Sequence, residues 1–179
     1  MKSLTHIWIF LFAAMVFFAA CKDRTPVIEF TPDNSTVVKE NMINANRVVI
    51  QSESTQIDAY IERRGWKMES LPCGALYRVT SDGKGYLIQP DDTVAVSYRL
   101  ESLDGTPIYT RQTDTLVVGR QQVTVALDDL LQRLNYGSQA QMIAPSNSAY
   151  GVVGDGDRVT SRTVIVYIIN NIKGINKSK

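Results

Sequence analysis

The sequence is poor in histidine and cysteine, and both shortages restrict its chemistry. Its one histidine, His6, falls in an apolar N-terminal stretch, so a chain that loses this stretch has none. Such a chain cannot use a Ser-His-Asp or Cys-His arrangement, and it cannot bind a metal through histidine. The cysteines are Cys21 and Cys73. Cys73 has mostly apolar neighbours and nothing to activate a thiolate, so we interpret it as a small buried residue.

An excess of charge of one sign is also missing. The chain has 19 Lys and Arg residues against 18 Asp and Glu residues. A balance near zero offers no electrostatic attraction to phosphates, so we expect no nucleic-acid partner. The acidic stretch 154–157 lacks the alternating ligands and the closing Glu of a calcium loop. The sequence therefore predicts neither a metal site nor a cofactor.

The N-terminal residues 7–20, IWIFLFAAMVFFAA, are apolar and uncharged. As a helix they would rise about 21 Å, less than the roughly 30 Å of a membrane's hydrocarbon core. Because Lys2 precedes this run and small residues end it, it predicts a cleaved export signal over residues 1–20. An uncleaved membrane anchor is the alternative interpretation.

The end of this run, from Phe18 to Cys21, resembles the bacterial lipobox, although Phe18 stands where leucine is usual. The resemblance implies lipid attachment at Cys21. Several acyl chains on one residue would anchor the protein stably, where a single chain would not. We therefore expect a lipid-anchored lipoprotein of the cell envelope, at the outer membrane in preference to the inner.

Removing the first 20 of the 179 residues leaves 159, enough for one ordinary domain and a tether. Residues 21–36 hold two prolines and no periodic pattern, which predicts the tether. Residues 37–64 have helical spacing and predict a helical segment that breaks near Ser52 and stops at Gly65. Its apolar stripe predicts either core packing or a homodimer through residues 37–64; its members are Val38, Met42, Ala45, Val49, Ile57, Tyr60 and Ile61.

After Gly65 the apolar period changes to two, which indicates strands. Residues 94–100 alternate, residues 103–106 carry a hairpin signal, and residues 139–144 and 163–172 predict two more strands. The last strand is rich in branched residues and should be central. A short helix is expected over residues 125–134. Residues 65–179 therefore predict an α+β fold, an antiparallel sheet wrapped on one short helix.

The order of these motifs carries more information than any one of them. The chain runs through DTVAVSY at 92–98, LDG at 103–105, VG at 118–119 and IAPSNSAYG at 143–151. In this order it resembles the FKBP-type peptidyl-prolyl cis/trans isomerases, and it is similar to their Bacteroidetes lipoprotein branch, including the gliding-motility-associated type. The resemblance implies an FKBP-like fold over residues 65–179. It also implies proline-containing exported polypeptides as partners.

When the family's pocket positions are carried over to this sequence, the resemblance implies a pocket with Tyr98 and Tyr150 as catalytic residues. Leu127 stands where the family has Trp, and Tyr109 stands where it has Asp. A shift of one residue would give that Asp position to Thr110, so the pocket is expected to lack an acidic residue. The substrate-binding residues implied are Ile108, Tyr109, Val123, Thr124, Leu127, Val159 and Tyr167.

Isomerisation of an X–Pro bond needs no histidine, because no proton moves and no covalent bond forms. The barrier of about 18–20 kcal/mol comes from amide resonance, so an apolar pocket with one well-placed hydroxyl can favour the twisted amide. We therefore expect an isomerase that assists the folding of exported proteins. The alternative is a catalytically impaired binding module, chaperone or scaffold, since the family's Asp, Trp and Phe positions hold other residues.

Overall fold

The computed structural model describes residues 34–176, and the predicted signal peptide and Cys21 lie outside this range. The chain divides into two compact units, residues 1–43 and 44–179. Within the described range, none of the helices combines the length and the apolar character that crossing a membrane requires.

Helix α2 (Asn34–Arg64) is continuous, and the predicted break near Ser52 is wrong. Side chains that were expected to cap a new helix instead bond within the existing one. The hydroxyl of Thr55 donates to the carbonyl of Gln51, one turn earlier, at 3.0 Å. The helix ends before Gly65, as predicted, and this glycine has the positive φ of 61° that favours its residue type.

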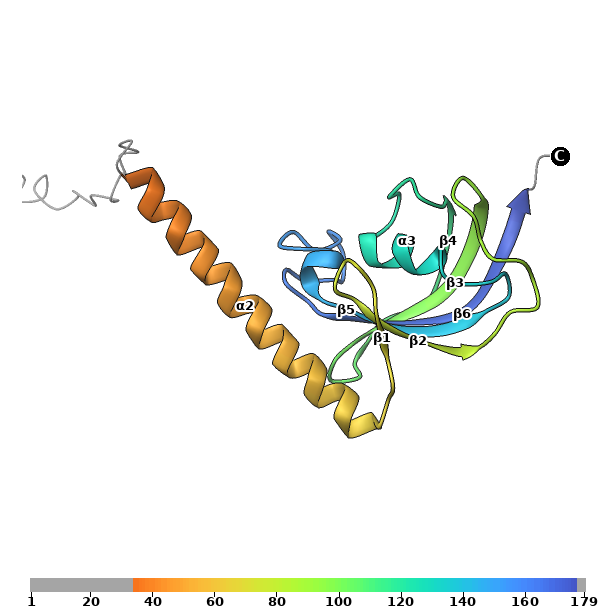
Figure 1. Cartoon of the computed structure of the whole chain (residues 1–179), viewed down its shortest axis with the longest axis horizontal. Coiled ribbons are helices and arrows are strands. Elements are labelled where there is room, and N and C mark those ends of the chain that lie inside the picture. Colours follow the sequence, from red (N-terminus) through yellow and green to blue (C-terminus); the bar gives the residue numbers. More distant parts are fainter. Residues whose placement is uncertain (1–33, 177–179) are drawn as a thin grey trace, which may run out of the picture. The chain divides into compact units, whose positions relative to one another are not determined.

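Six antiparallel strands form one sheet in the order β1-β2-β5-β6-β3-β4 (Figure 1). The last strand pairs with both β5 and β3, so it is central, as its branched residues predicted. The strands are β1 (Glu69–Ser70), β2 (Leu76–Ser81), β3 (Thr93–Ser102), β4 (Pro107–Val117), β5 (Gln139–Ala144) and β6 (Ile165–Asn176).

Strand β3 shows the predicted alternation, with Val94, Val96, Tyr98 and Leu100 buried on one face. Its hairpin to β4 turns at residues 103–106, also as predicted, where the amide of Gly105 donates to the carbonyl of Ser102 at 2.9 Å. The predicted α+β fold of an antiparallel sheet with a short helix is therefore confirmed.

Helix α3 (Val125–Leu131) covers the face of the sheet that β3 buries (Figure 1). It ends three residues before the predicted Leu134. The next amides, of Arg133 and Leu134, donate to carbonyls three residues back instead of four, which tightens the chain out of the α-helix.

The opposite face of the sheet has a smaller apolar cluster. Ile57 and Tyr60 of α2 pack there with Ile143 and Val166, which alternate along β5 and β6 with side chains of the main core. The later part of the predicted stripe is thus core. Residues 44–64 belong to the same compact unit as the sheet and supply part of its packing.

Candidate functional site

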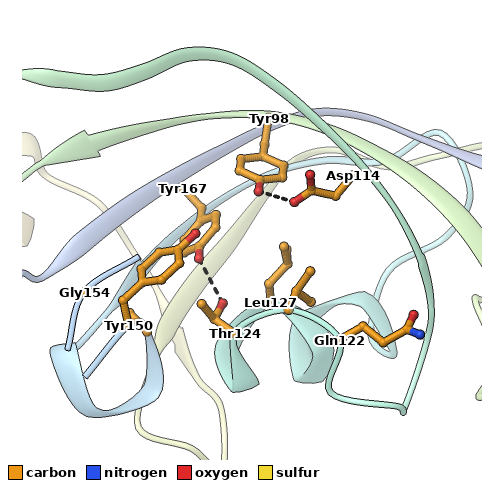
Figure 2. A pocket seen from close by; sticks show the side chains of 10 residues that line it. Tyr98, Asp114, Gln122, Thr124, Leu127, Tyr150, Gly154 and Tyr167 are labelled. Carbon is orange, nitrogen blue, oxygen red and sulfur yellow. Dashed lines mark hydrogen bonds between the residues drawn. The ribbon is translucent and has the colours of Figure 1, made fainter. Parts of the chain in front are cut away.

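A pocket of about 390 Å³ lies between the sheet, the start of α3 and the loop that follows β5 (Figure 2). This volume lies within the roughly 300–1,000 Å³ typical of small-molecule sites. Its lining residues are Tyr98, Asp114, Gln122, Val123, Thr124, Leu127, Ala149, Tyr150, Gly154 and Tyr167.

Tyr98 stands on β3 and reaches the pocket with only 4% of its surface exposed. Its hydroxyl donates to the carboxylate of Asp114, on β4, at 2.5 Å (Figure 2). Burial raises the pKa of Tyr98 well above its usual value, and the hydrogen bond to Asp114 raises it further. The phenol therefore keeps its proton, and that proton points at Asp114 rather than at a bound carbonyl.

Tyr167 lies deeper, on the central strand β6, and is fully buried. Its hydroxyl lies 2.9 Å from that of Thr124, and its ring centre is 5.5 Å from the ring of Tyr98. Burial raises the pKa of Tyr167 well above its usual value. Thr124 occupies the N-cap position of α3 without capping it, because its hydroxyl is bonded to Tyr167.

The opposite side of the pocket is a loop that carries Tyr150. It begins with a short 3₁₀ helix, η2 (Ser146–Ser148), whose first carbonyl accepts from the amides of Ala149 at 3.2 Å and Gly151 at 2.8 Å. Tyr150 is half-buried, and burial raises its pKa. Its hydroxyl lies beside that of Tyr167 (Figure 2). The loop thus presents a protonated hydroxyl at the pocket.

Six of the nine predicted site residues line this pocket: Tyr98, Val123, Thr124, Leu127, Tyr150 and Tyr167. Three do not. Ile108 packs against the core, and Val159 is buried in it. Tyr109 points its hydroxyl at Asp155, 2.6 Å away, in the later part of the loop. The catalytic and binding roles of all nine remain predictions.

The expectation that the pocket lacks an acidic residue is wrong, since Asp114 lies in it. Strand pairing explains the error. Asp114 pairs with Val96, and Gln112 with Tyr98, so Asp114 and Tyr98 are diagonal neighbours on one face of the sheet. Counting residues along the chain placed the acid near Tyr109, and the register shifts between Tyr98 and Glu101 move the true partner, Asp114, further along β4. The other lining residues missed are Gln122, Ala149 and Gly154.

The acidic residues near the pocket mouth bond to the protein itself. Burial alone would raise the pKa of Asp155, but hydrogen bonds from the Tyr109 hydroxyl and from backbone amides lower it below its usual value. In residues 34–176, no three His, Cys, Asp or Glu side chains are grouped closely enough to hold a metal ion. Cys73 packs against the main core, and burial raises the pKa of its thiol, which disfavours the thiolate.

Residues 85–171 match the family model described as FKBP-type peptidyl-prolyl cis-trans isomerase. The chain carries an FKBP-type domain. A curated protein of Neisseria meningitidis serogroup B (strain ATCC BAA-335 / MC58), a probable FKBP-type peptidyl-prolyl cis-trans isomerase FkpA, is 26% identical over 120 residues. The match covers 65% of this chain and 44% of that relative, so it spans less than half of the relative's length.

Solved structures share the fold of this FKBP-type domain. The peptidyl-prolyl cis-trans isomerase of Pseudomonas syringae pv. tomato str. DC3000 superposes with a TM-score of 0.58 at 23% identity, over 74% of this chain and 96% of its own. FkpA of Escherichia coli superposes with a TM-score of 0.58 at 16% identity, over 93% of this chain and 82% of its own. At these identities the likeness establishes the fold alone.

Proposed function

We propose that the FKBP-type domain isomerises X–Pro bonds in exported polypeptides and so assists their folding in the cell envelope. The observation that carries this proposal is a pocket walled by buried rings and aliphatic side chains, with the protonated hydroxyl of Tyr150 at its loop side. Membership of the FKBP family supports the reaction type.

The chemistry follows from the walls of the pocket. The planar amide is the more polar state of an X–Pro bond, and water stabilises it. Side chains such as Leu127 and Val123 exclude that water, which lowers the cost of twisting the bond. In the twisted state the carbonyl oxygen needs a donor, and the Tyr150 hydroxyl can supply one. Each 1.36 kcal/mol gained in this way raises the rate tenfold.

The hydrogen bond from Tyr98 to Asp114 gives the two tyrosines, Tyr98 and Tyr150, different roles. Because the Tyr98 hydroxyl donates to this carboxylate, Tyr98 offers a substrate mainly the face of its ring. The same bond fixes the ring's orientation. Tyr150, which stands on the loop, is therefore the donor, and Tyr98 is a wall of the pocket.

The test is proline isomerisation in a short peptide, followed by exchange NMR with protein purified from a host that expresses the full chain. We expect acceleration by the unaltered protein and about a tenfold loss of kcat/KM in Tyr150→Phe, the equivalent of roughly 1.4 kcal/mol. Tyr86→Phe is the matched control, since Tyr86 is 82% exposed and does not line the pocket, and it should keep most of the activity.

If stoichiometric protein did not accelerate proline isomerisation in the peptide, the proposed isomerase activity would be rejected. If such a protein still bound the peptide, the result would favour the alternative of a binding module or chaperone. Leu127, in place of a larger aromatic floor, is the observation that keeps this alternative open.

The envelope location is proposed from the uncharged run at residues 7–20 and from the lipobox-like Phe18 to Cys21. Labelled palmitate should be incorporated by a bacterial host that expresses the full chain, and Cys21→Ala should abolish this labelling. Labelling that survives Cys21→Ala would contradict attachment at this cysteine.

A homodimer through residues 37–64 is proposed as well. An exposed apolar residue of α2 supports it, Val48, which is 69% exposed. Sedimentation should show a dimer that Val48→Lys weakens. A monomer in the unaltered protein would reject the dimer.

A further inference from the structure

A buried carboxylate joins helix α2 to the loop that follows β5. Glu53 is only 7% exposed. One of its oxygens accepts from the backbone amide of Ser146 at 2.9 Å, and the other accepts from the Ser146 hydroxyl at 2.5 Å. Two residues 93 positions apart in sequence are therefore bonded at both carboxylate oxygens.

This arrangement is unusual, because the carboxylate of a glutamate on a helix is normally exposed to water. A buried carboxylate is costly unless hydrogen bonds satisfy it. Here a single residue, Ser146, provides both bonds, and no ion pair involves Glu53 in the described part of the chain. The position of Ser146 is thus tied to the helix by two bonds that share one acceptor group.

Ser146 also holds the residues on both sides of Tyr150. Its carbonyl accepts from the amide of Ala149 at 3.2 Å and from that of Gly151 at 2.8 Å. A path of hydrogen bonds therefore runs from Glu53 through the backbone of Ser146 to the amides of the residues before and after Tyr150. Displacing Ser146 would displace the Tyr150 hydroxyl.

Packing around Glu53 does not fill the space between helix and loop. A second cavity, of about 300 Å³, is lined there by side chains of both elements, including Ile50, Ile57, Pro145 and Asn147. Close packing holds a loop strongly only where its atoms are in contact. Beside this cavity, the two hydrogen bonds to Glu53 tie Ser146 directly to the helix.

We propose that Glu53 is a positioning residue for Tyr150, acting through Ser146, so that helix α2 helps to build the pocket that residues of the FKBP-type domain line. This inference rests on the proposed function, in which the Tyr150 hydroxyl is the donor to the twisted amide.

A double-mutant cycle tests it. In the unaltered background, Glu53→Ala should lower kcat/KM for the proline peptide about tenfold. In a Tyr150→Phe background the same change should lower it less than about twofold, because the hydroxyl that Glu53 positions is already gone. An equal loss in both backgrounds, or no loss in the first, would overturn the proposal.

Two further variants separate positioning from general damage. Glu53→Gln keeps an oxygen that can accept the Ser146 amide, so it should retain more activity than Glu53→Ala. Glu62→Ala removes an exposed carboxylate from the same helix and should change kcat/KM less than twofold. If Glu53→Ala does not fold, Glu53→Gln and Ser146→Ala replace it in the cycle, with the same expectation of non-additivity.

Amide hydrogen exchange keeps the inference testable apart from the activity. If the unaltered protein accelerates nothing, the proposed function fails. Positioning is then read from the amides of Ala149 and Gly151, whose exchange should be at least about fivefold faster in Glu53→Ala and unchanged in Glu62→Ala. Unchanged exchange at both amides in Glu53→Ala would overturn the proposal.

Discussion

The pocket has two sides that are built differently. The packed side consists of Tyr98, Thr124, Leu127 and Tyr167, which come from β3, β6 and the start of α3. Tyr98, Leu127 and Tyr167 are at most 4% exposed, and both tyrosine hydroxyls are bonded to neighbouring side chains. The loop side consists of Ala149, Tyr150 and Gly154, and it is held largely by backbone hydrogen bonds within the loop and by Glu53.

This difference separates two requirements of the proposed reaction. The packed side fixes the shape of the pocket and excludes water, which demands rigid, fully buried residues. The loop side supplies a hydrogen-bond donor, and a loop can adjust its position to a polypeptide that enters. Substitutions on the packed side should therefore change stability, while those on the loop side should change activity or little at all.

The largest effect is expected from Leu127→Ala on the packed side. Removing a fully buried leucine side chain leaves a cavity and should lower the free energy of unfolding by about 2–5 kcal/mol. Val125→Ala is the control on the same helix. Because Val125 is 39% exposed, its truncation should lower the free energy of unfolding much less. Urea denaturation measures both, and equal losses would contradict the rigid character of the packed side.

The second-largest effect is expected at high pH, where ionisation of buried tyrosines on the packed side should lower the free energy of unfolding. Burial raises the pKa of Tyr98 and Tyr167 above the value of 10.0. The unfolded chain therefore loses these protons first, and stability should be constant up to about pH 10 and fall above it, by about 1.4 kcal/mol per pH unit for each tyrosine.

Urea denaturation between about pH 9 and pH 11 measures this fall. Tyr167→Phe removes one of these buried phenols, so its stability should fall less steeply over the same range. A stability that stays flat up to pH 11 would show that these phenols are not buried.

The smallest effect is expected at the tip of the loop side. Val153 is 83% exposed, so Val153→Ser removes almost no buried surface. Its free energy of unfolding should change by less than about 0.5 kcal/mol. Thermal denaturation beside the unaltered protein checks this, and a loss above 1 kcal/mol would mean that the tip is packed after all.

The sequence predicts most of the fold because its signals are local. Alternation along residues 94–100 identifies β3, and Asp104-Gly105 marks the hairpin. The motif IAPSNSAYG at 143–151 predicts the loop that carries Tyr150, although its role in catalysis stays a prediction. These features depend on residues that are close together in the chain, so their signals can be recognised in a single sequence.

The features that were missed depend on distant residues. Asp114 reaches Tyr98 only through strand register, and register shifts between Tyr98 and Glu101 disturb any simple count along the hairpin. Glu53 gives no sign in the sequence that it is buried, because its partner, Ser146, lies 93 residues away. The helix around Ser52 was predicted to break because capping residues also occur within helices, where they bond to the preceding turn.

The place of β2 in the sheet has a consequence for where this domain can be cut. Strand β2 covers one side of β5, but it precedes residue 85, where the match to the family model begins. A chain trimmed to residues 85–171 would leave the amides and carbonyls of β5 unpaired along that side. An uncovered edge of this kind recruits strands from other molecules, and trimming would also remove Glu53. The region that identifies the family is therefore smaller than the unit in which both sides of β5 are paired.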